Sequence, residues 1–344
     1  MKRSISVSAI FVFALVMIFV TGCEDNKAGG ISSDSGTLAL YKMIPENATG
    51  FFAINVKKLT SLSVFDKMTK DLERDEIRKK MDMFENYQDF VNKTGIDPKK
   101  DIGGAVFVFF NEMDSKNQDF SILANISVNK EKILPIIKEK SKESSEQEYK
   151  GLTIYTFKED KGKEGGLVFM SDNIAAAGTI TGLKKIVDLS KGSGENIYSN
   201  KRMIDYMEKA GTSSIMSFVF DFPQKMKGKT GNGMFSADLS KAEALYGNVN
   251  YEGNSWTGNV ILVSHNDEGN KQLATTINSF KGLGAMAGPE VAELVNNIDI
   301  SSTAESLKLS FTISSDLLEK LKTKAEQKVK SYGTKPPPPP PGEH

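Results

Sequence analysis

The most constraining feature of the sequence is an apolar run near the amino terminus that ends at the only cysteine in the chain. Lys2 and Arg3 precede an apolar stretch at 10–20, and two small residues follow before Cys23. This order is typical of a secretory signal peptide. The stretch is too short for a membrane span, which needs about 20 apolar residues. The sequence therefore predicts export, with residues 1–22 removed as the signal peptide.

The end of the apolar run resembles the lipobox of bacterial lipoproteins. It reads Val20-Thr21-Gly22-Cys23, where the commoner form is Leu-Ala-Gly-Cys. The resemblance implies cleavage between Gly22 and Cys23, with lipid on the Cys23 thiol and on its new amino group. Because two or more acyl chains make a stable anchor, we expect a lipid-anchored, extracytoplasmic protein of the bacterial cell envelope. The alternative is an ordinary signal peptide followed by a chance cysteine.

The residues that follow the predicted lipid site indicate a flexible tether and suggest which membrane holds the protein. Residues 23–37 are polar and small, which is typical of a flexible linker. In enterobacterial sorting, an aspartate directly after the lipidated cysteine favours the inner membrane. Glu24 stands there in this chain, which favours the outer membrane over the inner one. With the thiol of Cys23 used by lipid, no disulfide is expected.

Charge and histidine content exclude several classes of function. The whole chain has 44 cations and 44 anions, and removal of the signal peptide leaves 42 against 44. Global charge therefore gives no reason to expect nucleic-acid binding. Only His265 and His344 are histidines, and this scarcity removes most metal, proton-shuttle and triad chemistry.

Hydrophobic periodicity predicts an α+β fold, and it begins near residue 38. In residues 38–194, branched and aromatic runs predict strands, whereas apolar residues three or four apart predict helices. The expected strands are 50–56, 104–110, 120–126, 152–157, 167–171 and 174–179. The expected helices are 59–72, 77–91, 129–142 with a break or kink at Pro135, and 182–189.

Residues 195–331 repeat this order of elements. A helix at 202–209 precedes strands at 214–222, 246–251 and 256–264, a helix from Asn266 through Phe280, strands near 298 and at 307–313, and a helix at 317–329. Asn129 and Asn266 are the predicted caps of corresponding helices. The prediction is two similar halves, each a mostly antiparallel sheet with helices packed on one face. The alternative is that the similar order of helices and strands in the two halves is accidental, as it can be in any α+β chain.

The carboxyl-terminal residues 332–344 predict a disordered, proline-rich tail. Proline lacks the backbone donor that helices and sheets need, so this run favours polyproline II. It is interpreted as a stiff, solvated tail. A ligand for a proline-reading domain is the alternative.

Two segments resemble catalytic motifs but depart from the required patterns. Residues 223–230 end in Gly-Lys-Thr as a phosphate-binding loop does, but Pro223 replaces the first glycine and no amphipathic helix follows. They are interpreted as a basic surface loop, so no nucleotide is expected. Residues 253–258 have one residue too many for a Gly-x-Ser-x-Gly elbow. His265, at a strand end, is interpreted as a solvent-facing residue rather than a catalyst.

Metal ligands are equally scarce. Residues 114–119 offer oxygens but lack the alternating acids and central glycine of a calcium loop, so they are interpreted as a hairpin tip. Acids among lysines, such as Glu73 and Glu76, indicate a charged surface. The sequence thus predicts no catalytic residue, no metal site and no cofactor.

The segment 282–288, Gly-Leu-Gly-Ala-Met-Ala-Gly, is the most unusual internal stretch. It has two interpretations: a flexible apolar lid in which Met286 adapts to lipid-like ligands, or a helix end whose small residues allow close packing before Pro289. We favour the second. The phenylalanines at 51–52, 107–110 and 218–222 are predicted to fill the core.

Three short motifs make the body of the chain similar to a group of exported bacterial proteins catalogued as domains of unknown function. They are residues 44–48 leading into Phe51, residues 95–102, and Asn173 with residues 182–186. The similarity spans most of 38–329. These motifs are structural, so the resemblance implies no catalytic residue.

Together these features predict a membrane-anchored, non-enzymatic lipoprotein that binds or scaffolds an unknown envelope protein. The alternative is a carrier or sensor of a lipid or other hydrophobic ligand, held in a groove of the sheets. A hydrolase with an unrecognised site is the remote alternative.

Overall fold

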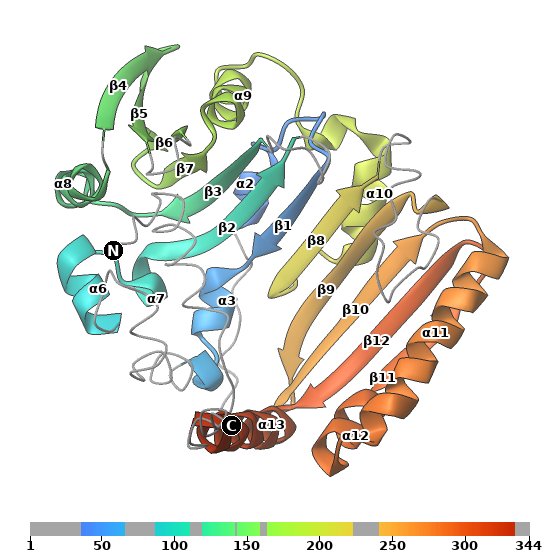
Figure 1. Cartoon of the computed structure of the whole chain (residues 1–344). Helices are drawn as coiled ribbons and strands as arrows, with labels where there is room; N and C mark the ends of the chain where they lie inside the picture. The colour runs from blue at the N-terminus through green and yellow to red at the C-terminus, as the bar shows by residue number, and fades with distance from the viewer. Residues whose placement is uncertain are drawn as a thin grey trace, which may run out of the picture.

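The computed structural model describes residues 36–65, 87–110, 119–141, 143–158, 164–222 and 241–333. The fold is α+β, as predicted, and it is built on one antiparallel sheet of twelve strands (Figure 1). Within the described ranges, no helix combines the length and the hydropathy that a membrane span requires.

The sheet contains every described strand of the chain. Their order across it is β11-β12-β10-β9-β8-β1-β2-β3-β7-β6-β5-β4. In chain order the strands are β1 (Gly50–Ile54), β2 (Ile102–Phe109), β3 (Phe120–Ile126), β4 (Glu143–Tyr149), β5 (Leu152–Lys158), β6 (Glu164–Ser171), β7 (Ile174–Gly178), β8 (Met216–Asp221), β9 (Ala244–Glu252), β10 (Ser255–Val263), β11 (Ile298–Ser302) and β12 (Ser306–Ser314).

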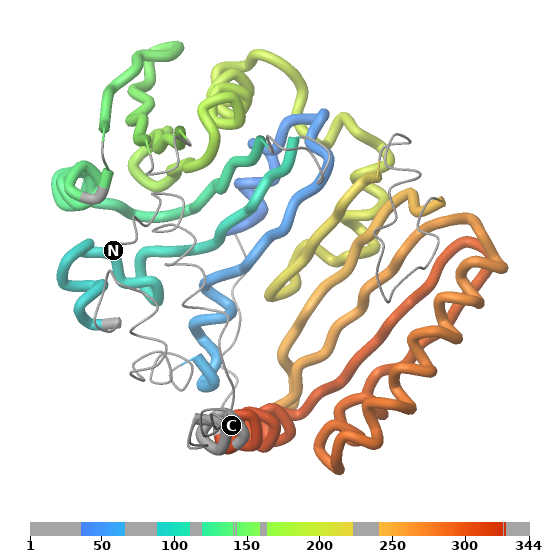
Figure 2. The backbone as a smooth tube through the Cα atoms, in the orientation of Figure 1, coloured from blue at the N-terminus to red at the C-terminus, as the bar shows by residue number. Residues whose placement is uncertain are grey.

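The two halves of the chain have the same strand order. Outward from the centre, β1-β2-β3-β7-β6 corresponds to β8-β9-β10-β12-β11. The halves meet where β1 pairs antiparallel with β8, from Gly50 opposite Phe220 to Ile54 opposite Met216. Figure 2 shows this junction, with blue β1 beside yellow β8. The structure therefore shows a feature that was not predicted: both halves belong to one continuous sheet.

Helices lie on both faces of the first half, whereas the sequence predicted them on one face only. They are α2 (Leu38–Tyr41), α3 (Val56–Thr60), α6 (Tyr87–Thr94), α7 (Pro98–Asp101), α8 (Lys130–Lys140) and α9 (Ile180–Ser190). The second half contributes a short 3-10 turn η1 (Ile197–Ser199) and α10 (Lys201–Ala210), α11 (Asp267–Ala285), α12 (Pro289–Asn296) and α13 (Ser315–Gly333).

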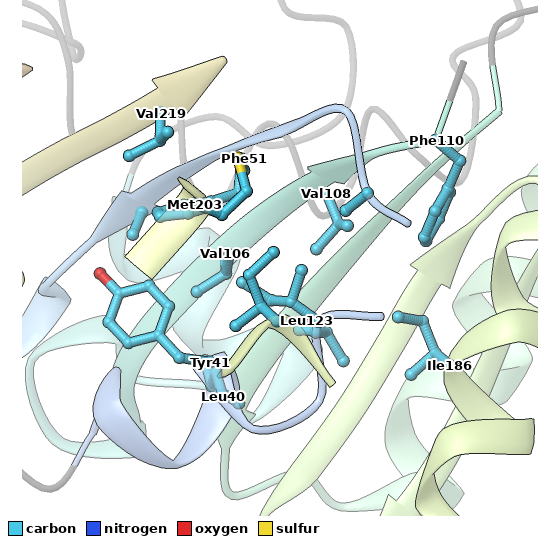
Figure 3. Close-up of a cluster of buried hydrophobic side chains, with 14 of the residues drawn as sticks. Leu40, Tyr41, Phe51, Val106, Val108, Phe110, Leu123, Ile186, Met203 and Val219 are labelled. Atoms are coloured by element: carbon cyan, nitrogen blue, oxygen red, sulfur yellow. The ribbon is translucent and has the colours of Figure 1, made fainter. Parts of the chain in front are cut away.

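Two apolar clusters occupy the opposite faces of the sheet. The face that carries Ile122 and Leu167, here named the α8 face, packs against α3, α6 and α8. The other, the α9 face, carries Phe51, Leu123 and Val168 and packs against α2, α9 and α10 (Figure 3). Strands β2 and β3 are apolar on both sides because both faces are covered, which explains their nearly continuous hydrophobic runs.

The outcome differs among three local predictions, made at Asn129, Pro135 and Asn266. The Asn129 side chain accepts bonds from the backbone N–H groups of Glu131 and Lys132, and so caps α8. Helix α8 continues through Pro135, so the interruption that was one of the two expectations there is absent. Asn266 stands at the N-cap of α11 but makes no side-chain cap bond. Its amide therefore does not contribute the expected capping energy.

Other elements differ from the expectation. Helix α3 begins at Val56, earlier than the predicted 59–72, because Asn55 caps it through the N–H of Lys58. Residues 66–86, which include parts of the predicted helices 59–72 and 77–91, lie outside the described residues. Strand β4, turn η1 and helices α2 and α12 were not predicted. Of these, β4 has no hydrophobic pattern to reveal it.

Polar contacts fasten the β4–β5 hairpin to α9. Asp188 of α9 accepts a 2.9 Å bond from the Tyr149 hydroxyl and pairs at 2.7 Å with the Lys150 ammonium. Lys150 also donates to the Ser193 hydroxyl at 3.0 Å. The hydrogen bond from Lys150 is the main cause that lowers the pKa of Asp188.

This anchor gives the hairpin a defined pH dependence. Because the folded-state pKa of Asp188 is lowered, its carboxylate stabilises the docked hairpin above the ordinary value of 3.8, and this contribution is lost as pH falls further. We expect constant amide-exchange protection at the hairpin tip from about pH 5 to 9, and loss at lower pH before global unfolding. An Asp188→Asn variant should abolish this low-pH step. The step would persist in the variant if another group controlled it.

Candidate binding site on an apolar sheet face

The α9 face of the sheet is less apolar in the second half than in the first. One continuous row of cross-strand partners shows the difference. In the first half its members are Ala53, Val106, Leu123, Ala176 and Val168. In the second half they are Ser217, Asn248, Asn259, Ser310 and Asp299. Away from this row, Val219, Ala244 and Val263 on the same face are buried in the apolar cluster that includes α10, so the α9 face of the second half is polar only in part.

The α8 face of the second half carries a continuous set of large apolar side chains on β8, β9, β10 and β12. We name it the apolar floor. All of its members are half-buried and none is fully buried: Phe218, Phe220, Leu245, Val249, Val260, Leu262, Leu309 and Phe311. On the counterpart strands of the first half, Ile122 of β3 is fully buried, whereas Phe52 of β1 and Phe107 of β2 are half-buried like the floor. The floor is therefore covered less completely than β3, and its half-buried apolar surface continues across the junction onto β1 and β2.

Three phenylalanine rings of the floor lie against glycines on neighbouring strands. A Cβ at Gly247 would lie 2.7 Å from the Phe218 ring, and one at Gly258 would lie 2.5 Å from the Phe311 ring. Phe220 lies against Gly50 in the same way. Such aromatic–glycine pairs fill the space that the missing side chains leave. The floor consequently has low relief along β8, β9 and β10.

Helices α11 and α12 cover the edge of this half. Helix α11 lies in front of β11 and β12, whereas α10 lies behind β8 (Figure 1). The lysine at 281 donates to the backbone carbonyl of Ile298 and so fixes α11 to β11. Gly284 allows α12 to approach, since a Cβ there would lie 3.2 Å from Val295. This close packing is the role that we favoured for the small residues of 282–288.

The turn between α11 and α12 also exposes two apolar side chains. Leu283 is 64% exposed and Met286 is 84% exposed. Gly288 then links the helices at φ +136°, in the left-handed region that favours glycine. The turn is therefore a small apolar surface outside the floor.

The residues weighed for catalysis do not assemble into a catalytic site in the described part of the chain. The His265 side chain is 56% exposed, and its Nε2 lies 4.0 Å from a Glu243 oxygen. The neighbouring Ser264 donates its hydroxyl to the Asn270 side chain instead of approaching the imidazole. The geometry thus agrees with the interpretation of His265 as a solvent-facing residue.

A charged cluster surrounds that histidine. Arg202 of α10 lies 2.8 Å from an Asp221 oxygen and 3.7 Å from a Glu243 oxygen. Burial raises the pKa of Asp221, while Arg202 opposes the rise. Among the described residues, no three acids, histidines or cysteines are grouped as a metal site requires. The cluster joins α10 to the ends of β8 and β9.

An open depression of about 480 Å³ lies between α12 and α13. Charged and polar side chains line it, and an ion pair between Glu290 and Lys324 crosses from one helix to the other. The lysine lowers the pKa of Glu290. This lining does not suit the apolar ligand that the sequence suggested as an alternative.

Several predicted features lie outside the described residues. They include the lipid-attachment residue Cys23, the cleavage residue Gly22, the tail at 332–344 beyond Gly333, the phosphate-loop-like segment 223–230 and most of the calcium-like segment 114–119. The apolar floor, by contrast, was not predicted, because Phe218 and Phe220 were expected to be core residues.

Comparison with known proteins gives structural likeness but no family. No family model matches the chain, and no curated protein matches its sequence. Three crystal forms of a protein named TP0453 are similar in structure. Form III has 14% identity and a TM-score of 0.49 over 81% of this chain and 95% of that one; form I has 10% and 0.42 over 81% and 94%; form IV has 12% and 0.43 over 82% and 95%. Values this low carry no inference about function.

Proposed function

We propose that this chain is a non-enzymatic binding protein of the bacterial cell envelope, anchored through lipid on Cys23, that holds a hydrophobic ligand on the apolar floor. The observation that carries the proposal is the half-buried apolar face on β8, β9, β10 and β12, which lies opposite a row of polar residues. A sheet that is apolar on one face is stable when something covers that face. Acyl chains would supply about 25 cal/mol per Å² of apolar area removed from water.

The test is native mass spectrometry with lipid extraction on a soluble form that begins at Glu24. Because this form lacks the lipidated cysteine, any lipid that it retains is bound by the folded part. The proposal expects an apolar passenger in stoichiometric amount. A clean apo mass, unchanged after incubation with lipid vesicles, would contradict it.

A pair of adjacent variants tests whether the floor is the binding surface. Val260→Asn places an amide on the floor, and Ile261→Asn places one on the opposite face at the next residue of β10. Both positions are half-buried, so similar losses of stability are expected. Burying an unpaired amide against acyl chains costs about 1–3 kcal/mol. We therefore expect about tenfold weaker lipid retention for Val260→Asn only, and equal retention by both variants would locate the ligand elsewhere.

A second candidate function, scaffolding of an envelope protein, is supported by the exposed Leu283 and Met286 at the α11–α12 turn. Exposed apolar side chains that lie together are typical of interaction surfaces. Cross-linking in cells distinguishes the two functions. A protein neighbour that is lost in a Leu283→Ser, Met286→Ser variant, with an apo mass for the soluble form, would favour scaffolding.

A further inference from the structure

Strand β4 is an addition to the first half that contributes almost nothing to the core. In the second half the sheet ends at β11, the counterpart of β6, whereas in the first half β5 and β4 continue it. Six of the seven residues of β4 are exposed, and the seventh, Tyr149, is half-buried. On β5, by contrast, Ile154 and Phe157 are buried. Burial therefore explains β5 but does not explain β4.

The outer edge of β4 presents free backbone groups in a regular array. A two-residue turn with Lys150 at φ +49° and Gly151 at φ +77° joins the strands, which is the type I′ geometry of tight hairpins. All seven residues of β4 pair with β5 without a bulge. Since Tyr149 and Leu152 close the turn as a hydrogen-bonded pair, every second residue of β4 directs its N–H and C=O outward. These are Ser144, Glu146 and Glu148.

The two edge strands of the sheet, β11 and β4, differ in how they are protected against pairing with another strand. The other edge strand, β11, has five residues and packs against α11 and α12. Proteins usually protect an edge by shortening it, covering it, or adding proline or a bulge. Strand β4 has none of these in the described structure, where it pairs only with β5. What it carries is acidic charge, which opposes pairing with another acidic strand.

Side-chain contacts hold β4 in an extended conformation. The Ser145 and Thr156 hydroxyls bond at 2.6 Å, the Thr153 hydroxyl donates to Glu148 at 2.6 Å, and Lys158 pairs with Glu143 at 2.7 Å. The Tyr149 contact with Asp188 fixes the end at the turn. An incoming strand would thus meet an edge that is already ordered, which reduces the entropic cost of association.

We infer that the outer edge of β4 binds an extended basic segment of a partner protein as an additional strand of the sheet. Backbone bonds to Ser144, Glu146 and Glu148 would supply most of the affinity, as in other cases of strand addition. Lysine or arginine at alternate positions of the segment would face Glu148 and Glu146, of which Glu146 already pairs with Lys138 of α8 at 3.2 Å. A second copy of this chain fits less well, because pairing centred on the strand places Glu146 opposite Glu146.

The experiment uses the full mature chain in detergent and a capped peptide, Thr-Lys-Val-Lys-Val-Lys-Thr, with a peptide that has glutamate in place of lysine as its control. We expect the basic peptide to bind, and to slow exchange at the outward amides of residues 144, 146 and 148 more than at the inward amide of Gln147. Glu146→Pro removes one outward donor and no bond to β5. It should weaken binding at least about tenfold, or about 1.4 kcal/mol, while leaving exchange at Gln147 unchanged.

Charge reversal supplies a second, independent readout. The double variant Glu146→Lys, Glu148→Lys should prefer the acidic peptide over the basic one. Equal binding of both peptides by the native chain, or binding that is insensitive to Glu146→Pro, would overturn the inference. So would a concentration-dependent dimer that Glu146→Pro abolishes, because it would assign the edge to a second copy of the chain.

Discussion

Phe51→Ala is expected to destabilise the protein by about 3–5 kcal/mol, the cost of truncating a fully buried phenylalanine. Phe51 is 0% exposed and lies in β1, the strand that joins the two halves. Its ring lies 5.3 Å from that of Tyr41, and the Tyr41 hydroxyl bonds the Ser217 side chain of β8 at 3.1 Å. Figure 3 shows Phe51 and Tyr41 among Val106, Met203 and Val219. The cavity would therefore open where both halves meet.

The adjacent residue provides the control. Phe52 points to the α8 face, is half-buried, and contacts Phe107 edge-to-face at 6.2 Å. Its truncation should cost less, about 1–2 kcal/mol, because less apolar area is lost from the core. Denaturant unfolding measures both values. Equal costs would mean that the α9-face core is not the main support of the junction.

The strands were predicted wherever aromatic and branched residues are dense. Residues around Phe51, Phe107 and Ile122 were assigned correctly because strands buried on both faces have nearly continuous apolar runs. Strand β4 was missed because Glu-Ser-Ser-Glu-Gln-Glu-Tyr has neither apolar alternation nor high strand propensity. It forms because the Lys150–Gly151 turn and the pairing with β5 hold it extended. Such pairing leaves no periodic pattern of apolar residues in the sequence.

The apolar floor was missed although its signal is present in the sequence. In β9 the order Gly-Asn-Val-Asn-Tyr at 247–251 alternates polar and apolar residues, which indicates one solvated face. The corresponding first-half strand, Ala-Val-Phe-Val-Phe at 105–109, does not alternate. The difference between two otherwise similar halves is thus the clue. Phe218 and Phe220 were assigned to the core because aromatic strand residues are usually buried, and this difference between the halves was not considered.

The similar strand order and the different faces have a common physical explanation. Each half buries its α8 face or part of it, so that face keeps large apolar residues in both. On the α9 face, α2 and α9 cover the first half, where the row through Leu123 is apolar, and α10 covers β8 and β9 of the second half. In the second half the same row passes through Asn259 and Ser310. The second half therefore differs from the first in the polar residues along this row, although α10 covers its β8 and β9.

Cys23→Ser is expected to release the protein from the membrane almost completely. In the proposed function the thiol of Cys23, at the end of the lipobox-like Val20-Thr21-Gly22-Cys23, carries the lipid, and serine provides no thiol for the thioether. Acyl chains contribute about 0.8 kcal/mol per buried CH₂, so their loss removes the anchor. Fractionation of the cell envelope measures the change. Retention of Cys23→Ser in membranes, with the signal peptide cleaved, would contradict lipid anchoring.

A second substitution tests which membrane holds the protein. Glu24→Asp places aspartate directly after the lipidated cysteine, the arrangement that retains lipoproteins in the inner membrane of enterobacteria. We expect native protein in the outer membrane, and the variant displaced to the inner membrane in an enterobacterial host. Because Glu24→Asp keeps the charge and shortens the side chain by one methylene, folding and lipidation should be unaffected. Native protein found with inner-membrane markers would overturn the outer-membrane assignment while leaving the anchor itself intact.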